Sequence, residues 1–153
     1  DSVTLEQRTQ ALEQMSRQRW EDAANGAPAY GPPSLDLQGG EPQFVLEYHD
    51  YYRTPRGYHA RAVNSGNAWT QTTPLSFMNM PILSYISEIS PRPVLLIHGE
   101  NAHSRYFSET AYEAAAEPKE LLIVPGANHT DLYDKLDVIP FDRMVAFFGD
   151  ALV

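Results

Sequence analysis

The sequence contains no cysteine among its 153 residues, and this absence excludes several kinds of chemistry. Disulfide bridges, a thiol nucleophile and zinc sites built on thiolates all need cysteine. No apolar run approaches the roughly 20 residues that a membrane-spanning helix requires, and residues 1–7 do not resemble a signal peptide. These absences point to a cytoplasmic protein.

Positive charge is also scarce. Acidic residues outnumber basic ones by 20 to 11, which gives a formal net charge of −9. Such a chain repels phosphate backbones and anionic lipids, so we expect neither nucleic acid nor a membrane surface as a partner. With 42% hydrophobic and 20% charged residues, the composition is typical of a soluble globular domain.

The first part of the chain is predicted to be helical. Thr4 and Gln7 have the spacing of a helix capping box, and apolar residues then recur at helical spacing to about residue 24, where Asn25 and Gly26 supply a stop. Residues 27–42 are rich in proline and glycine and predict an irregular connection.

An aromatic-rich stretch, residues 44–80, follows with poor periodicity. It predicts short helices joined by turns at residues 55–57 and 64–67, and residues 82–89 predict one more short helix. We interpret residues 1–90 as a helical, lid-like region.

The pattern changes at residue 91. Residues 93–99 and 119–126 are apolar runs that end in glycine, as expected for strands buried on both faces. Residues 104–117 and 139–152 have helical spacing. Strand, helix, strand and helix in this order predict an α/β fold with a parallel sheet over residues 91–153.

Two apolar parallel strands leave faces and an edge uncovered, so they do not form a stable sheet alone. We therefore expect the sheet to be completed by segments outside these residues.

Two polar loops, residues 98–104 and 126–131, follow the predicted strands, where parallel sheets place their functional groups. The segments PRPVLLIHGENAHSRYFSETAY and EPKELLIVPGANHTDLYD resemble the C-terminal part of α/β-hydrolases. They are similar to a bacterial subfamily of uncharacterised hydrolases related to dienelactone hydrolases. The resemblance covers essentially the whole chain but only half of the family's fold.

This resemblance implies that His129, in a Gly-x-x-His loop after the last strand, is the general base of a catalytic triad. A neutral imidazole takes the proton of a serine hydroxyl and returns it to the leaving group. The alternative is an ordinary polar histidine in a loop.

The carboxylate that would orient His129 is less clear. Many α/β-hydrolases carry it three residues after the glycine, where this chain has Ala102. Glu100 is the nearest carboxylate and is our candidate. Its rivals are Asp131 and a carboxylate in the absent half, and Glu100 is also explained as a charge at a helix terminus.

We expect no metal and no cofactor. His98 and His103 flank Glu100, but short loops give them no fixed ligand spacing. Ser104 is explained as a helix N-cap rather than a nucleophile. The nucleophile turn Gly-x-Ser-x-Gly does not occur, and the nearest approach, at residues 64–66, follows no buried strand.

The aromatic stretch is expected to wall an apolar substrate pocket, although aromatic residues in irregular segments are often plain core. Our candidates for substrate binding are Tyr48, Tyr51, Tyr52, Trp69, Phe77 and Met78. Arg53 and Arg56 are interpreted as surface ion pairs, with binding of a substrate carboxylate as the alternative.

The leading hypothesis is the C-terminal half of a serine hydrolase that acts on a carboxylic ester, thioester or lactone. Its partner is the N-terminal half, on the same or another chain, which bears the nucleophile. One alternative is a non-catalytic scaffold or binding module with this fold, and another is dehalogenase or C–C hydrolase chemistry. Whether the protein forms a homo-oligomer stays open.

Overall fold

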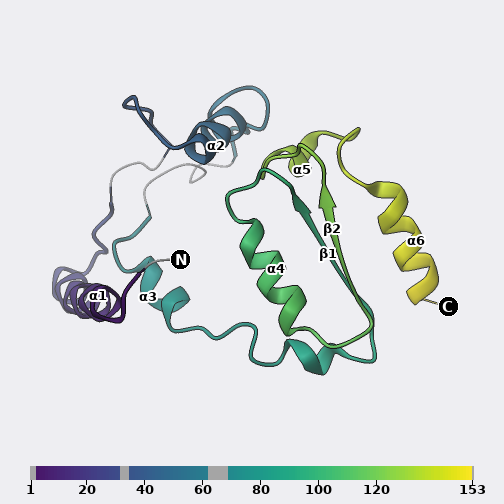
Figure 1. The fold of residues 1–153 in the computed structure, drawn as a ribbon. Helices are drawn as coiled ribbons and strands as arrows, with labels where there is room; N and C mark the ends of the chain where they lie inside the picture. Colours follow the sequence, from purple (N-terminus) through teal and green to yellow (C-terminus); the bar gives the residue numbers. More distant parts are fainter. Residues whose placement is uncertain (1–2, 32–34, 62–68, 153) are drawn as a thin grey trace. The chain divides into compact units, whose positions relative to one another are not determined.

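The computed structural model describes residues 3–31, 35–61 and 69–152, and the chain forms two compact units (Figure 1). The first consists of Asp1–Asp36 and Ala62–Pro81, and the second of Leu37–Arg61 and Ile82–Val153. Residues 37–61 therefore belong to the same unit as both strands. The sequence predicts a different division, into a lid-like region of residues 1–90 and an α/β region of residues 91–153, and this division stays a prediction.

In the first unit, helix α1 (Leu5–Asn25) packs with the short helix α3 (Thr73–Met78). Both hydrogen bonds of the capping box between Thr4 and Gln7 are present. Gly26 ends α1 with a φ of 67°, a left-handed conformation that glycine adopts without strain. The helix predicted from the sequence is confirmed.

The connection after α1 has neither helix nor strand in its described part, as predicted. One antiparallel bridge joins Tyr30 to Thr70 in this unit. Pro32, Pro33 and the turn predicted at residues 64–67 lie outside the described residues.

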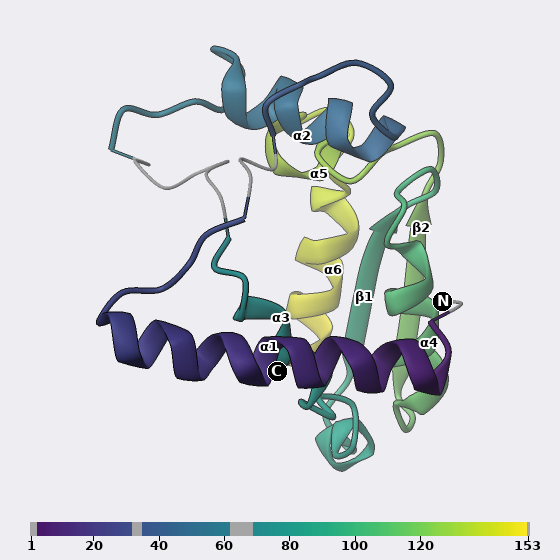
Figure 2. The same ribbon diagram turned by 90° about the vertical axis from the view of Figure 1, so that its left-hand side faces the viewer.

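The second unit contains two parallel strands, β1 (Val94–Gly99) and β2 (Lys119–Val124), which are paired over their whole length. Helix α4 (Arg105–Ala114) connects them. Figure 1 shows α4 and the final helix α6 (Phe141–Ala151) on opposite sides of the strand pair, and Figure 2 shows the two strands side by side. The predicted order of strand, helix, strand and helix is confirmed.

Several boundaries differ from the prediction. Helix α4 is three residues shorter at its end because Ala115 is extended, and Lys119 covers the freed carbonyl oxygens of Tyr112 and Ala115. Residues 82–89 contain only the 3-10 turn η1 (Ile86–Ile89), flanked closely by prolines.

Two further helices complete the second unit. Helix α2 (Gln43–Arg53) belongs to the predicted group of short helices, whereas α5 (Asp131–Asp134) was not predicted. Among the described helices, none combines the length and the apolar character needed to cross a membrane.

The strands are only half-buried within the described part of the chain. Large apolar side chains on the neighbouring helices are also exposed, with Phe107 on α4 61% exposed and Val145 on α6 71% exposed. Exposed apolar surfaces of this kind are typical of strands and helices that belong to a larger sheet, where further strands and helices cover them. That these further strands come from outside the chain stays a prediction.

Gly99 allows the ends of the two strands to approach closely. A Cβ atom there would lie 2.5 Å from the carbonyl oxygen of Ala127 and 2.8 Å from that of Asn128. Both are backbone atoms, so only a shift of the loop after β2 could make room.

We predict that Gly99→Ala lowers the free energy of unfolding by about 1–3 kcal/mol, because the added methyl group overpacks this contact. Urea denaturation of the full-length protein measures the change. The matched control is Gly149→Ala on α6, where an added Cβ meets nothing within 4 Å. This substitution should raise the free energy of unfolding by about 0.5–1 kcal/mol, because alanine favours the helix over glycine. Equal effects of the two substitutions would contradict the prediction.

Candidate active site

The loops after β1 and β2 are joined by their backbones at the carboxyl end of the sheet. The amide of Glu100 donates to the carbonyl oxygen of Val124 at 3.0 Å, and the amide of Asn101 donates to that of Ala127 at 2.9 Å. The side chain of Asn101 adds a bond to the carbonyl oxygen of Gly126. The segment before His129 is thus fixed to β1.

Asn128 fixes the segment after it. Its Oδ1 accepts hydrogen bonds from the amides of Thr130 and Asp131, both at 3.1 Å, while Asp131 Oδ2 accepts from the amide of Asn128. Thr130 is fully buried. His129 therefore lies in a turn whose neighbours on both sides are held, which limits where its ring can point.

The imidazole of His129 has a hydroxyl partner at each nitrogen. Ser104 Oγ, at the start of α4, lies 2.8 Å from Nδ1, and the hydroxyl of Tyr133, on α5, lies 2.8 Å from Nε2. His98, on β1, lies beside this pair, with its Nε2 3.2 Å from Ser104 Oγ. The structure thus brings His129 to the tips of both strands.

Burial lowers the pKa of His129 below its usual value, and the imidazoles of His103 and His98 lower it further. The pKa of His98 is lowered for the same reason, burial first, with His103 and Arg105 contributing. An imidazole with a lowered pKa is neutral at pH 7, the form that accepts a proton.

Tyrosines from α2 pack against His129 and Tyr133. The ring of Tyr48 lies edge-on to that of His129 at a centroid distance of 5.3 Å, and Tyr51 and Tyr52 both pack against Tyr133. We call Tyr48, Tyr51, Tyr52 and Tyr133 the tyrosine wall. Burial raises the pKa of Tyr48 and of Tyr133, so these phenols keep their protons.

The remaining predicted site residues lie elsewhere. Glu100 Oε2 accepts a hydrogen bond from the amide of Gly126 at 2.8 Å, and its role as triad acid stays a prediction. Trp69, Phe77 and Met78 belong to the first unit, and their part in substrate binding also stays a prediction.

Sequence reasoning missed two partners of His129. Tyr133 was not singled out, although its position four residues after His129 is the spacing of neighbours on a helix. Ser104 was interpreted as an N-cap, and it does occupy that position, but its side chain makes no capping hydrogen bond. The hydroxyl of Ser104 bonds to the histidines instead.

Arg56 joins α2 to the loop of His129. Its Nε and Nη2 form paired hydrogen bonds to the carboxylate of Asp134, at 2.9 and 2.7 Å. Nη1 bonds to Asp50 at 2.9 Å, and Nη2 donates to the carbonyl oxygen of Thr130 at 3.1 Å. The ion pairs predicted for Arg56 are confirmed, but the side chain is only 18% exposed.

The described residues contain no group of three or more histidine, aspartate or glutamate side chains that could hold a metal ion. His98, His103 and His129 are near one another as rings, with centroids 5.6 Å apart for His103 and His129 and 5.9 Å apart for His98 and His129. Edge-on and tilted contacts between the rings, together with hydroxyl contacts, account for this arrangement.

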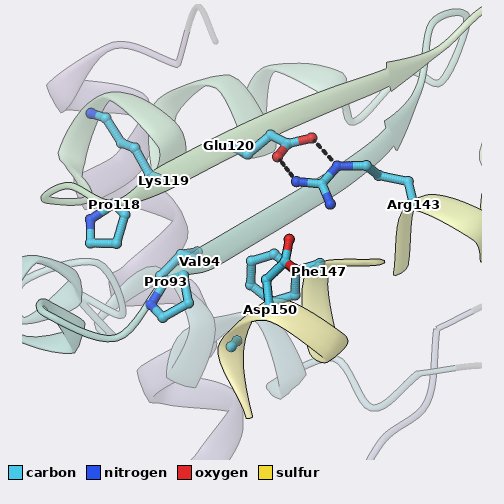
Figure 3. A pocket seen from close by; sticks show the side chains of 9 residues that line it. Pro93, Val94, Pro118, Lys119, Glu120, Arg143, Phe147 and Asp150 are labelled. Carbon is cyan, nitrogen blue, oxygen red and sulfur yellow. Dashed lines mark hydrogen bonds and ion pairs between the residues drawn. The ribbon is translucent and has the colours of Figure 1, made fainter. Parts of the chain in front are cut away.

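A pocket of about 240 Å³ lies at the other end of the strands, beside α6 (Figure 3). Glu120 and Arg143 face each other there through paired hydrogen bonds. The lining residues are Pro93, Val94, Pro118, Lys119, Glu120, Arg143, Phe147, Asp150 and Ala151. Parallel sheets carry their active sites at the carboxyl ends of the strands, so this pocket is not the candidate site.

The chain resembles larger bacterial proteins, although no family model matches it. It is 76% identical over 152 residues to the uncharacterised protein PA2218 of Pseudomonas aeruginosa, a match that covers 99% of the chain and 41% of that protein. It is 29% identical over 130 residues to the uncharacterised protein YcjY of Escherichia coli, covering 80% of the chain and 40% of that protein. The chain thus spans less than half the length of these relatives.

Solved structures show which fold this is. The crystal structure of PA2218 matches with a TM-score of 0.91 at 76% identity, over 99% of this chain and 47% of that one. The α/β-hydrolase GrgF from Penicillium matches with a TM-score of 0.68 at 24% identity, and the match covers 99% of this chain and 52% of GrgF. DcsB, solved in complex with its substrate analogue, matches with a TM-score of 0.69 at 17% identity, and the match covers 97% of this chain and 52% of DcsB.

The chain therefore has the C-terminal portion of an α/β-hydrolase fold, in which two parallel strands with flanking helices follow a helical region. The predicted fold class is confirmed. The similarity to the dienelactone-hydrolase-related subfamily stays a prediction.

The lowered pKa of His129 predicts that its ring gains a proton only below the usual value of 6.5, so that it is neutral and able to accept a proton at pH 7. His103→Gln should raise the pKa of His129, since it removes an imidazole that opposes protonation. An NMR titration of the His129 ring measures the shift, with the exposed His59→Gln as control. A fall in the pKa after His103→Gln would contradict this account.

Arg56→Lys should lower the free energy of unfolding by about 1–3 kcal/mol, since lysine cannot form the paired bonds to Asp134. Hydrogen exchange should also rise at the amides of Thr130 and Asp131. The control is Arg92→Lys, where an exposed side chain bonds one carbonyl oxygen and a change within about 0.5 kcal/mol is expected. Unchanged exchange in Arg56→Lys would contradict the proposed link.

Proposed function

We propose that this chain is the C-terminal half of a serine hydrolase and supplies its general base, His129. The observation that carries the proposal is the geometry of this residue. A neutral imidazole lies at the carboxyl ends of two parallel strands, and its Nε2 faces a hydroxyl group at 2.8 Å. The α/β-hydrolase fold places the base of its triad in the loop after the last strand.

The reaction follows from this arrangement. Nε2 of His129 takes the proton of a serine hydroxyl as that oxygen attacks the carbonyl carbon of a carboxylic ester, thioester or lactone. The same nitrogen then returns the proton to the leaving group. The serine and the donors that stabilise the oxyanion come from the N-terminal half of the protein, which is the partner of this chain.

The hydroxyl of Tyr133 occupies the place that the nucleophile would take at Nε2. An oxygen at hydrogen-bonding distance from this nitrogen is the contact that proton abstraction requires, so the site already accommodates one. A serine hydroxyl that replaces the phenol would meet the same lone pair.

Glu100 is a candidate for the carboxylate that orients His129. It follows β1 directly, two residues before the position at which many α/β-hydrolases carry the acid and this chain has Ala102. Its Oε2 accepts a hydrogen bond from the amide of Gly126, so this role requires the carboxylate to turn from that amide toward His129.

The tyrosine wall is the candidate for the acyl side of a substrate pocket. Tyr48, Tyr51 and Tyr52 come from one face of α2 and stand beside the base. Their rings would contact apolar atoms, and their hydroxyls would bond to polar ones. Trp69, Phe77 and Met78, which belong to the first unit, stay separate predictions for substrate binding. We expect the protein in the bacterial cytoplasm.

We predict that His129→Ala abolishes labelling of the complete protein by a fluorophosphonate probe, because the nucleophile loses its base. The wild-type label should be found on the serine of the N-terminal half and not on residues 1–153. Mass spectrometry of the labelled peptides locates the modification, and the exposed His59→Ala serves as the matched control.

Labelling of the His129→Ala protein at the wild-type rate would refute the proposed function. Failure of the wild-type protein to react, with no serine in a nucleophile turn, would favour the non-catalytic scaffold. An aspartate in that turn would favour dehalogenase chemistry.

A further inference from the structure

A row of hydrogen-bonding side chains runs from His129 into the protein. Ser104 Oγ lies 2.8 Å from His129 Nδ1 and 3.2 Å from His98 Nε2, and His98 Nδ1 lies 3.2 Å from Ser108 Oγ. Its members come from the loop after β2, from β1 and from α4, which Figure 1 shows side by side. At the other end, Tyr133 bonds to His129 Nε2, and its hydroxyl has Tyr52 as a second partner.

The row has two self-consistent directions, because each neutral imidazole has one N–H donor and one acceptor nitrogen. In the first direction, His129 Nδ1–H donates to Ser104, whose hydroxyl donates to His98 Nε2, and His98 Nδ1–H donates to Ser108. In the second, every donor and acceptor is exchanged. Only the first leaves the lone pair of His129 on Nε2, where a general base needs it.

Tyr133 favours the first direction. A phenol is a stronger hydrogen-bond donor and a weaker acceptor than the aliphatic hydroxyl of serine, because its proton is far more acidic. The hydroxyl of Tyr52 is a second partner of this phenol, but an imidazole nitrogen is a stronger hydrogen-bond acceptor than a phenol oxygen. The Tyr133 proton is therefore directed to Nε2 of His129, which places the ring proton on Nδ1, toward Ser104. Burial raises the pKa of Tyr133, which keeps this proton in place.

We propose that Ser104 and His98 are the positioning residues that hold His129 in the Nδ1–H tautomer, a role that a carboxylate has in a Ser-His-Asp triad. The inference rests on the proposed function of His129 as a general base. Two neutral side chains, Ser104 and His98, thereby determine which nitrogen of His129 carries the proton.

Three observations favour these residues over Glu100. Ser104 is only 7% exposed, so solvent does not compete for its hydroxyl. Its side chain does not cap α4, so the histidine contacts are its polar role. The carboxylate of Glu100 is bound to the amide of Gly126, whereas Nδ1 of His129 already has its partner.

Ser104→Ala in the complete protein tests the inference. We expect kcat to fall roughly 10²-fold with KM changed less than about twofold, because the ring loses the acceptor that fixes its proton on Nδ1. Ser104→Thr keeps the hydroxyl and should restore most of kcat. In ¹⁵N-histidine spectra, His129 should be the Nδ1–H tautomer in the wild-type protein and a mixture of both tautomers in Ser104→Ala.

A second pair of variants tests the same positioning role even if Ser104→Ala fails to fold. His98→Leu removes the acceptor for the Ser104 hydroxyl, whereas His98→Gln keeps an oxygen that can accept it. We expect the leucine variant to lose at least about tenfold more kcat than the glutamine variant. Thr110→Ala is the control, since it deletes a hydroxyl that bonds only the backbone of the same helix.

Two further variants separate this inference from the proposed function. Glu100→Gln should change kcat less than tenfold if Ser104 positions the ring, and a loss above roughly 10³-fold would overturn the inference in favour of a carboxylate. If His129→Ala abolishes labelling while Ser104→Ala keeps both the tautomer and kcat, the inference fails alone. If His129→Ala labels normally, the proposed function fails first.

Discussion

The parallel pairing of β1 with β2 is the constraint on which the candidate site depends. It brings Gly99 against the carbonyl oxygens of Ala127 and Asn128, where only a hydrogen atom fits. The amides of Glu100 and Asn101 then bond across to the loop of His129. A shift of one residue in this register would break these contacts together, so the position of His129 follows from the alignment of the two strands.

Charge around His129 is organised in two zones. Burial and the imidazoles of His103 and His98 favour the neutral form of its ring, which also packs against the ring of Tyr48. One turn further along the chain, Asp131 and Asp134 are paired with Lys135 and Arg56. Because the carboxylates next to the base loop have cationic partners of their own, they stabilise the backbone of that loop rather than the imidazolium.

The sequence predicted the elements that depend on local pattern. Continuous apolar runs identified both strands, and the capping box identified the start of α1. The Gly-x-x-His spacing after β2 identified the loop at the strand tips, although the chemistry of His129 itself stays a prediction. These features are encoded within a few residues of one another, which is why pattern reasoning found them.

The parts that could not be predicted depend on contacts between distant residues. Ser104 reaches His129 across 25 positions and Arg56 reaches Asp134 across 78, distances over which a single sequence gives no signal. Residues 82–89 had the composition of a helix, but the prolines on either side left too little room for more than a turn. The hydroxyl of Ser104 was misinterpreted because an N-cap position explains a serine so readily.

The bonds of Arg56 have a mechanical consequence. By holding Asp50 on α2, the carbonyl oxygen of Thr130 and the carboxylate of Asp134 at once, one guanidinium ties the tyrosine-bearing helix to the loop that carries the imidazole. The two cannot hinge apart without losing several charged hydrogen bonds. Incoming molecules must therefore approach the imidazole by a route that does not require α2 to swing open.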